Sequence, residues 1–194
     1  LKKVREAEIL HIDIMDGNFV PNLTMGPQVV KALRGKTDQE FDLHLMLRHP
    51  LQYVPMFREA GADWITFHIE CDDDPRTVLA SIEASGAKPG IAIKPGTPVE
   101  ELFPFGEQLH HVTVMTVEPG FGGQRFMADQ LPKIAQLHER IEQVNPACEL
   151  EVDGGIDPET SPLVKQAGAN VLVAGSAVFR QSDRAAAIAA IRNA

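Results

Sequence analysis

The stretch EAGADWITFH at residues 59–68 decides the fold, because it combines the end of a helix, a glycine turn and the start of a buried strand. The stretch QAGANVLVAG at residues 166–175 repeats this order later in the chain. In both stretches the glycine supplies the left-handed backbone conformation that commonly ends a helix. Helix-to-strand units that recur along one chain are typical of a parallel sheet covered by helices.

Seven apolar, strand-like runs alternate with helical patterns along the chain. The strand-like runs occupy residues 8–14, 41–46, 63–69, 90–94, 111–117, 149–152 and 170–174. The helical patterns between them occupy residues 27–33, 50–60, 75–84, 130–143, 158–166 and 183–191. No linker rich in Pro, Gly or Ser interrupts this alternation, so we expect a single domain over residues 1–194.

The number of units predicts an α/β fold, a TIM (β/α)8 barrel whose first strand is absent and which is incomplete at its N-terminus. The chain starts at Leu1 inside a charged segment, residues 1–6, that has a helical pattern. The alternative is an open doubly wound sheet, which would carry a G-x-G-x-x-G fingerprint that this sequence lacks. We expect the missing strand to leave a slot in the barrel wall between the first and last strand-like runs.

The segment before the first strand-like run departs from the two repeats. When the strands are aligned, Ala7 and Glu8 flank the place where the repeats carry a Gly-Ala pair. A helix ending at Ala7 would then have to reverse into the strand without connecting residues. We therefore expect residues to be omitted here, and the Cα atoms of Ala7 and Glu8 to lie on the order of 5–10 Å apart instead of about 3.8 Å.

The composition is that of a globular protein, with 44% hydrophobic and 23% charged residues. The net charge of -9, from 18 Lys and Arg against 27 Asp and Glu, argues against a nucleic-acid partner. No apolar run is long enough to span a membrane, and no signal peptide is recognisable. Because Cys71 and Cys148 are too few for a disulfide framework, we expect a reducing, cytoplasmic location.

Ionisable side chains gather at the ends of the strand-like runs, where a barrel builds its active site. The period of two places His11 and Asp13 on one face of their strand, and His44 and Asp153 fall at matching heights on two other strands. Imidazole and carboxylate groups suit Zn, Fe, Mn or Co. We therefore predict one divalent metal ion bound by these four residues, with a hydrogen-bonded core role as the alternative for any single histidine.

The remaining histidines are assigned less central places. We expect His68 and Glu70 to lie in the next ring outward from the metal site, with supporting or rim roles. We expect His49, His110, His111 and His138 to lie at the surface or at helix ends.

Three glycine-rich turns follow successive strand-like runs and predict an anion site. Such turns leave backbone N–H groups free for a phosphate, and the loops after the last two barrel strands often bind one. A tight turn is the alternative for any one of them. The residues concerned are Gly120, Phe121, Gly122, Gly123, Gly154, Gly155, Gly175 and Ser176.

Three methionines, Met15, Met46 and Met115, lie on the strands that carry the candidate ligands or precede the glycine-rich turns. They suit a soft lining against a flat reaction intermediate, and adaptable core packing is the equally strong alternative.

Two carboxylates, a metal and a phosphate grip suit proton abstraction next to a carbonyl. Removal of a proton from one face and its return to the other gives epimerisation through an enediolate. A Schiff-base aldolase that uses Lys94 is a weaker alternative, because an amine has no obvious task beside a metal. A Ser–His–Asp hydrolase is disfavoured, since no nucleophile-elbow motif is present.

Five motifs closely resemble the ribulose-phosphate 3-epimerase family, and the resemblance runs over essentially the whole chain. They are HIDIMDGNFVPN (11–22), FDLHLM (41–46), VMTVEPGFGGQ (114–124), EVDGGI (151–156) and VAGSAVF (173–179). The resemblance implies a TIM barrel that interconverts D-ribulose 5-phosphate and D-xylulose 5-phosphate in the pentose phosphate pathway. Its decarboxylase and hexulose-phosphate synthase relatives carry a Lys where this chain has His44, so that branch is disfavoured.

The resemblance also assigns roles to the candidate residues. It implies metal ligation by His11, Asp13, His44 and Asp153, with Asp13 and Asp153 as the acid–base pair and His44 also touching substrate. It implies that phosphate lies against Gly122, Gly123, Gly154, Gly155, Gly175 and Ser176. We expect a small phosphosugar and further copies of this chain as partners, without nucleic acid or membrane.

Two alternatives stay open within this interpretation. The first is an epimerase acting on D-allulose 6-phosphate, which shares most of the motifs. The second is an inactive phosphosugar-binding protein, because members of the family begin with a strand whose Ser contacts substrate, and that strand is absent here.

Overall fold

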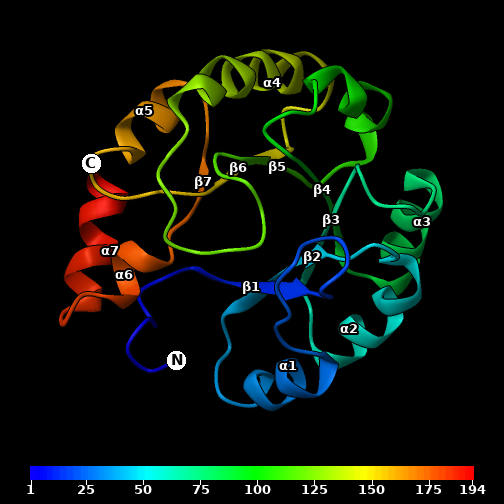
Figure 1. The fold of residues 1–194 in the computed structure, drawn as a ribbon, viewed down its shortest axis with the longest axis horizontal. Coiled ribbons are helices and arrows are strands. Elements are labelled where there is room, and N and C mark those ends of the chain that lie inside the picture. Colours follow the sequence, from blue (N-terminus) through cyan, green and yellow to red (C-terminus); the bar gives the residue numbers. More distant parts are fainter.

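A computed structural model describes all residues from Leu1 to Ala194 and places seven strands in one strongly curved sheet (Figure 1). Each strand pairs in parallel with the next one along the chain, which is the topology of a TIM barrel. The predicted fold class is therefore confirmed. The strands are β1 (Ile9–Met15), β2 (Glu40–Met46), β3 (Trp64–His68), β4 (Lys88–Ile93), β5 (His111–Met115), β6 (Glu149–Asp153) and β7 (Val171–Val173).

The helices lie outside the ring of strands (Figure 1). They are α1 (Pro27–Arg34), α2 (Val54–Ala60), α3 (Pro75–Ser85), α4 (Leu131–Val144), α5 (Ser161–Gln166), α6 (Ser176–Phe179) and α7 (Arg184–Asn193), with 3₁₀ turns η1 (Leu51–Tyr53), η2 (Val99–Gln108) and η3 (Ala128–Gln130). Several begin with Pro in the first turn, where its missing N–H costs nothing. None of the helices combines the length and the apolarity that crossing a membrane requires.

The predicted slot in the barrel wall is present, because β1 and β7 are the two ends of the sheet and are not hydrogen-bonded to each other. The N-terminal segment and α7 lie beside this slot (Figure 1). There the Arg192 guanidinium pairs with the Glu8 carboxylate at 2.7 Å.

The expected helix over residues 1–6 is wrong, since residues 2–8 form turns and bends. Val4 N–H donates to the Leu1 carbonyl, and Ala7 N–H donates to the Val4 carbonyl. The turns bury Val4 against the core, and the Gln39 amide binds the Ala7 carbonyl at 2.6 Å. Because no helix ends at Ala7, the steric reason for a break between Ala7 and Glu8 disappears.

The two faces of the sheet differ in chemistry. On β2, Leu43 and Leu45 belong to the large apolar cluster between the strands and the helices. The alternate residues Asp42 and His44 are fully buried on the inner face. Buried ionisable groups are costly unless they are paired, so their presence indicates a functional site inside the barrel.

Candidate active site

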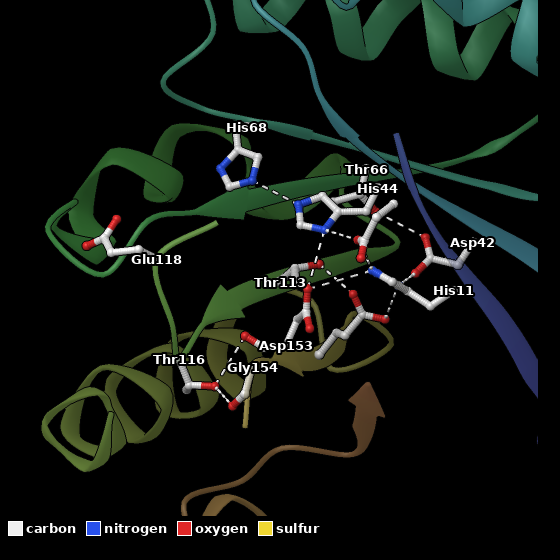
Figure 2. A network of polar contacts seen from close by, with 12 residues as sticks. His11, Asp42, His44, Thr66, His68, Thr113, Thr116, Glu118, Asp153 and Gly154 are labelled. Atoms are coloured by element: carbon white, nitrogen blue, oxygen red, sulfur yellow. Dashed lines mark hydrogen bonds and ion pairs between the residues drawn. The ribbon is translucent and has the colours of Figure 1, made fainter. Parts of the chain in front are cut away.

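The four predicted metal ligands come from three strands and meet inside the C-terminal mouth of the barrel. Figure 2 labels three of them, His11, His44 and Asp153. The parallel register of β1 and β2 sets Asp13 beside His44, and β6 brings Asp153 from the other side. Asp13 Oδ1 lies 3.3 Å from His11 Nε2 and 3.4 Å from His44 Nδ1. Asp153 Oδ2 lies 3.5 Å from His44 Nδ1 and 3.8 Å from His11 Nε2.

These atoms fit a divalent cation. His11 Nε2, Asp13 Oδ1 and His44 Nδ1 are buried, and none has a hydrogen-bond partner. Native proteins rarely leave buried polar atoms unsatisfied unless an ion or a water completes them. Ligands at zinc-like distances in a tetrahedral site lie about 3.4 Å from one another, which matches three of the four separations. The donor set of two imidazoles and two carboxylates also suits a divalent transition metal.

The same proximity shifts the pKa values of these groups. Burial lowers the pKa of His44, but the carboxylates of Asp13 and Asp153, at 3.4 and 3.5 Å from its Nδ1, outweigh burial and raise it to about 9. Burial raises the pKa of Asp13, whereas the nearby imidazoles of His11 and His44 lower it well below its ordinary range. The centre of the cluster therefore favours positive charge, whether carried by protons or by a metal ion.

His11 is oriented from behind by a carboxylate. Its Nδ1 lies 2.6 Å from Oδ2 of Asp42, which is fully buried and also accepts a hydrogen bond from the Thr66 hydroxyl. An imidazole that donates from Nδ1 to a carboxylate presents its Nε2 lone pair to a ligand. Asp42 thus fixes His11, a role that the sequence pattern did not assign, although the period of two places it on the inner face.

His44 is backed by His68 and Glu70, which lie in the ring behind the cluster where the sequence placed them. His44 Nε2 lies 2.8 Å from His68 Nε2, and His68 Nδ1 lies 3.1 Å from the Glu70 carboxylate. Burial lowers the pKa of His68 to about 4, so this ring is neutral at pH 7. Burial raises the pKa of Glu70, but hydrogen bonds from His68 and Thr97 lower it to about 2.

The floor of the site contains a second buried carboxylate and a histidine. Glu151 is only 1% exposed and accepts a hydrogen bond from Thr113, and burial together with the Asp42 carboxylate raises its pKa to about 8. His111 is fully buried, so its predicted surface place is wrong. The alternation of His111 with Thr113 along β5 was the available signal, because both point into the barrel.

The three methionines are buried beside the cluster. Met15 and Met46 are neighbours in the register of β1 and β2, and they pack with Val20 under the partly buried Phe19. Met115 is the register partner of Asp153. Met15 and Met46 thus lie one inward-facing position beyond Asp13 and His44, toward the mouth, and Met115 lies level with Asp153.

The glycine-rich turns after β5 and β6 contain glycines with positive φ angles, which side chains disfavour, whereas Gly175 after β7 has a φ of -94°. Gly154 and Gly155 have φ angles of 129° and 67°. A Cβ on Gly154 would lie 2.6 Å from Val117, and one on Gly155 would lie 2.6 Å from the backbone N of Phe126. Close packing and positive φ therefore require glycine at both positions.

The turn after β5 is held close to the turn after β7. A Cβ on Gly123 would lie 3.0 Å from Arg180 Nη2 and 4.0 Å from Ser176 Cβ. The Asn22 amide donates to the Gly120 carbonyl at 3.0 Å and ties the same turn to the loop after β1. Phe121 is exposed at the tip. The turns predicted to bind phosphate are thus brought together at one side of the mouth.

A parallel barrel with ionisable groups at its C-terminal mouth defines the chain as a TIM-barrel enzyme. The model of the Ribulose-phosphate 3 epimerase family matches residues 1–179, and the chain belongs to this family. The resemblance of the five motifs is confirmed.

Curated relatives are similar over most of their length. Ribulose-phosphate 3-epimerase of Bacillus subtilis (strain 168) is 46% identical and is matched over 96% of this chain and 86% of that protein. The enzyme of the same name from Mycobacterium tuberculosis (strain ATCC 25618 / H37Rv) is 45% identical, over 97% of this chain and 82% of that protein.

Solved structures share the fold at low sequence identity. 3-Hexulose-6-phosphate synthase from Salmonella typhimurium has a TM-score of 0.72 at 19% identity, covering 99% of this chain and 88% of that one. 3-Keto-L-gulonate-6-phosphate decarboxylase from Vibrio cholerae O1 biovar El Tor has a TM-score of 0.72 at 18% identity, covering 99% and 86%. These likenesses support the barrel architecture alone.

Proposed function

We propose that the protein interconverts D-ribulose 5-phosphate and D-xylulose 5-phosphate by inverting the configuration at C3. Membership of the ribulose-phosphate 3-epimerase family supports this reaction class. The observation that carries the proposal is the convergence of two carboxylates and two imidazoles, three of whose facing atoms are buried and unpaired.

His11, Asp13, His44 and Asp153 would hold one divalent ion, of Zn, Fe, Mn or Co. When bound, this ion would stabilise negative charge that develops on the oxygens of the substrate.

Asp13 and Asp153 are the proposed acid–base pair. Their carboxylates come from β1 and β6, which are not neighbours in the sheet. Their side chains are 46% and 18% exposed, so both can meet a ligand in the mouth. One carboxylate takes the C3 proton and leaves an enediolate, and the other, as the carboxylic acid, returns a proton to the opposite face.

Different groups would hold the phosphate and the sugar of the substrate. Backbone N–H groups of the glycine-rich turns would bind the phosphate, through Gly122, Gly123, Gly154, Gly155, Gly175 and Ser176. Met15, Met46 and Met115 would line the flat enediolate, since they are buried and follow or pair with the residues of the cluster on β1, β2 and β5. His44 would contact the sugar as well as the ion.

A coupled assay that consumes D-xylulose 5-phosphate tests the proposal. We expect turnover of D-ribulose 5-phosphate with a kcat/KM at least tenfold above that for D-allulose 6-phosphate. A higher kcat/KM for the hexulose phosphate would assign the site to the longer sugar. Binding of D-ribulose 5-phosphate without turnover, in protein supplied with divalent metal, would identify a binding protein instead.

A further inference from the structure

His44 is the one candidate ligand whose outer nitrogen contacts another imidazole. His44 Nε2 and His68 Nε2 lie 2.8 Å apart, and the two fully buried rings stack with an interplanar angle of 23° (Figure 2). Two imidazole nitrogens form a hydrogen bond only when one carries a proton and the other a lone pair. The direction of this bond therefore decides which nitrogen of His44 is free to face the cluster.

Glu70 sets the direction from the far end. An ionised carboxylate only accepts hydrogen bonds, and Glu70 Oε2 lies 3.1 Å from His68 Nδ1. These contacts therefore assign a proton to His68 Nδ1 and leave the lone pair of the ring on Nε2. His44 Nε2 must then be the donor, which leaves His44 Nδ1 to face Asp13 and Asp153.

Glu70 is itself held in place by the next strand. Its other oxygen, Oε1, accepts the backbone N–H of Lys94 at 2.8 Å and also contacts the Thr97 hydroxyl. A backbone N–H can only donate, so Oε1 must remain an acceptor. The chain of contacts thus runs from the loop after β4 through Glu70 and His68 to His44.

We propose that Glu70 and His68 are positioning residues that fix His44 with its Nδ1 lone pair toward the candidate metal. The proposal rests on the proposed function, because it assigns His44 Nδ1 a ligand role. Neither residue touches the centre of the cluster, and both act through His44. His11 does not depend on them, because Asp42 holds it separately at 2.6 Å.

We call the hydrogen-bond chain Glu70–His68–His44 the relay. Replacement of Glu70 by glutamine reverses the direction of its hydrogen bonds while the side chain keeps nearly the same size and shape. The amide oxygen of Glu70→Gln takes the place of Oε1, where Lys94 N–H requires an acceptor. The amide NH₂ group then faces His68 Nδ1, which must accept, so the His68 proton moves to Nε2. That proton points at the donor on His44 Nε2. The variant therefore either breaks the contact or forces the His44 proton onto Nδ1, where it blocks a metal ion.

Two measurements test the relay. The ¹⁵N shifts of the histidine rings in the metal-free protein at neutral pH should show His68 protonated on Nδ1, and on Nε2 in Glu70→Gln. Titration of metal-free protein with Zn²⁺ against a chelator should show an affinity loss on the order of 10–100-fold in Glu70→Gln. Glu118→Gln is the matched control, because Glu118 is an exposed carboxylate near the mouth that contacts neither histidine (Figure 2); its affinity should stay within about twofold.

A second variant separates bond direction from packing. His68→Gln keeps an oxygen acceptor near the place of Nε2, so it should bind Zn²⁺ more tightly than His68→Leu, which offers none. A His68 ring protonated on Nε2 in the unaltered protein would overturn the proposal. So would a Zn²⁺ affinity of Glu70→Gln equal to that of Glu118→Gln.

Failure of the relay and failure of the proposed function give different results. If the unaltered protein epimerises D-ribulose 5-phosphate and binds Zn²⁺ while Glu70→Gln binds equally well, only the relay is wrong. If the unaltered protein shows neither activity nor Zn²⁺ binding, the proposed function fails. The His68 tautomer then still decides the direction of the hydrogen bonds.

Discussion

At the scale of single residues, the two aspartates are close to equivalent in distance to the histidines but not in exposure. Asp153 lies deeper than Asp13, with side chains 18% and 46% exposed. If each serves one face of the substrate, loss of one carboxylate stops inversion and leaves exchange at the other face. Proton exchange at one face without inversion therefore tests the two-base scheme, which a measurement of total activity alone cannot do.

We expect Asp153→Asn to lower kcat for epimerisation by on the order of 10²–10⁴ while deuterium from solvent still enters C3 of one epimer. NMR of each epimer in D₂O measures the exchange, and the metal content of the variant is measured alongside. Asp38→Asn, an exposed change of the same kind, should keep full activity. Equal washing of deuterium into both epimers in the Asp153 variant would contradict the two-base scheme.

The residues of the cluster could be predicted because the sequence pattern indicates both which residues share a face of a strand and where each strand ends. His11 and Asp13, two residues apart, had to share a face of β1. The contacts behind the ligands could not be predicted in this way. The role of Asp42 behind His11 depends on which strand is adjacent and at what register, and only the β1–β2 pairing supplies that.

At the scale of elements, apolar runs bounded by Gly and Pro located the strands to within two residues, because strands buried on both faces form short and largely apolar runs. In two segments the structure differs from the pattern that the sequence predicts. The 3₁₀ turn η2 contains Pro104 and Gly106, which disrupt a helical pattern. Residues 1–6 look helical by charge spacing, but burial of Val4 and contacts from Gln39 favour turns.

The pairing of β4 with β5 depends on a glycine, whose lack of a side chain leaves room for a histidine ring. Gly90 is the register partner of His111, and a Cβ on Gly90 would lie 2.0 Å from His111 Nε2. The ring fills the space beside Gly90 and contacts Thr66, so no flexible chain end can move aside. A single methyl group here overpacks the barrel floor.

We therefore expect Gly90→Ala to lower the free energy of unfolding by about 1–3 kcal/mol. Urea unfolding followed by circular dichroism measures the change. Gly96→Ala is the control, because nothing lies within 4 Å of its Cβ, and it should stay within about 0.5 kcal/mol of the unaltered protein. Equal stabilities of the two variants would show that His111 moves freely, against the packing described here.

At the scale of the whole molecule, the barrel encloses a column of ionisable groups inside an apolar shell. The fully buried residues Asp42, His44, His68 and His111 lie on the inner face, with Glu151 only 1% exposed. Folding therefore changes the proton affinity of several groups at once, and stability must depend on pH. The metal candidates complicate this dependence, so the clearest reporter is a histidine away from them.

His111 is that reporter. Burial lowers its pKa to about 4 in the folded protein, against 6.5 for an ordinary histidine. Between these values the unfolded chain binds a proton that the folded protein does not, so stability rises with pH over this range and falls as pH decreases. We expect the free energy of unfolding to decrease from pH 6.5 toward pH 4, with His111 contributing part of the slope. His111→Phe, which cannot titrate, should show a shallower slope over this window, whatever its stability at pH 7. Urea unfolding at a series of pH values measures the slope, and ¹⁵N shifts of the ring follow its titration directly. An unchanged slope in His111→Phe, or a ring that titrates near 6.5, would mean that water reaches the floor of the barrel.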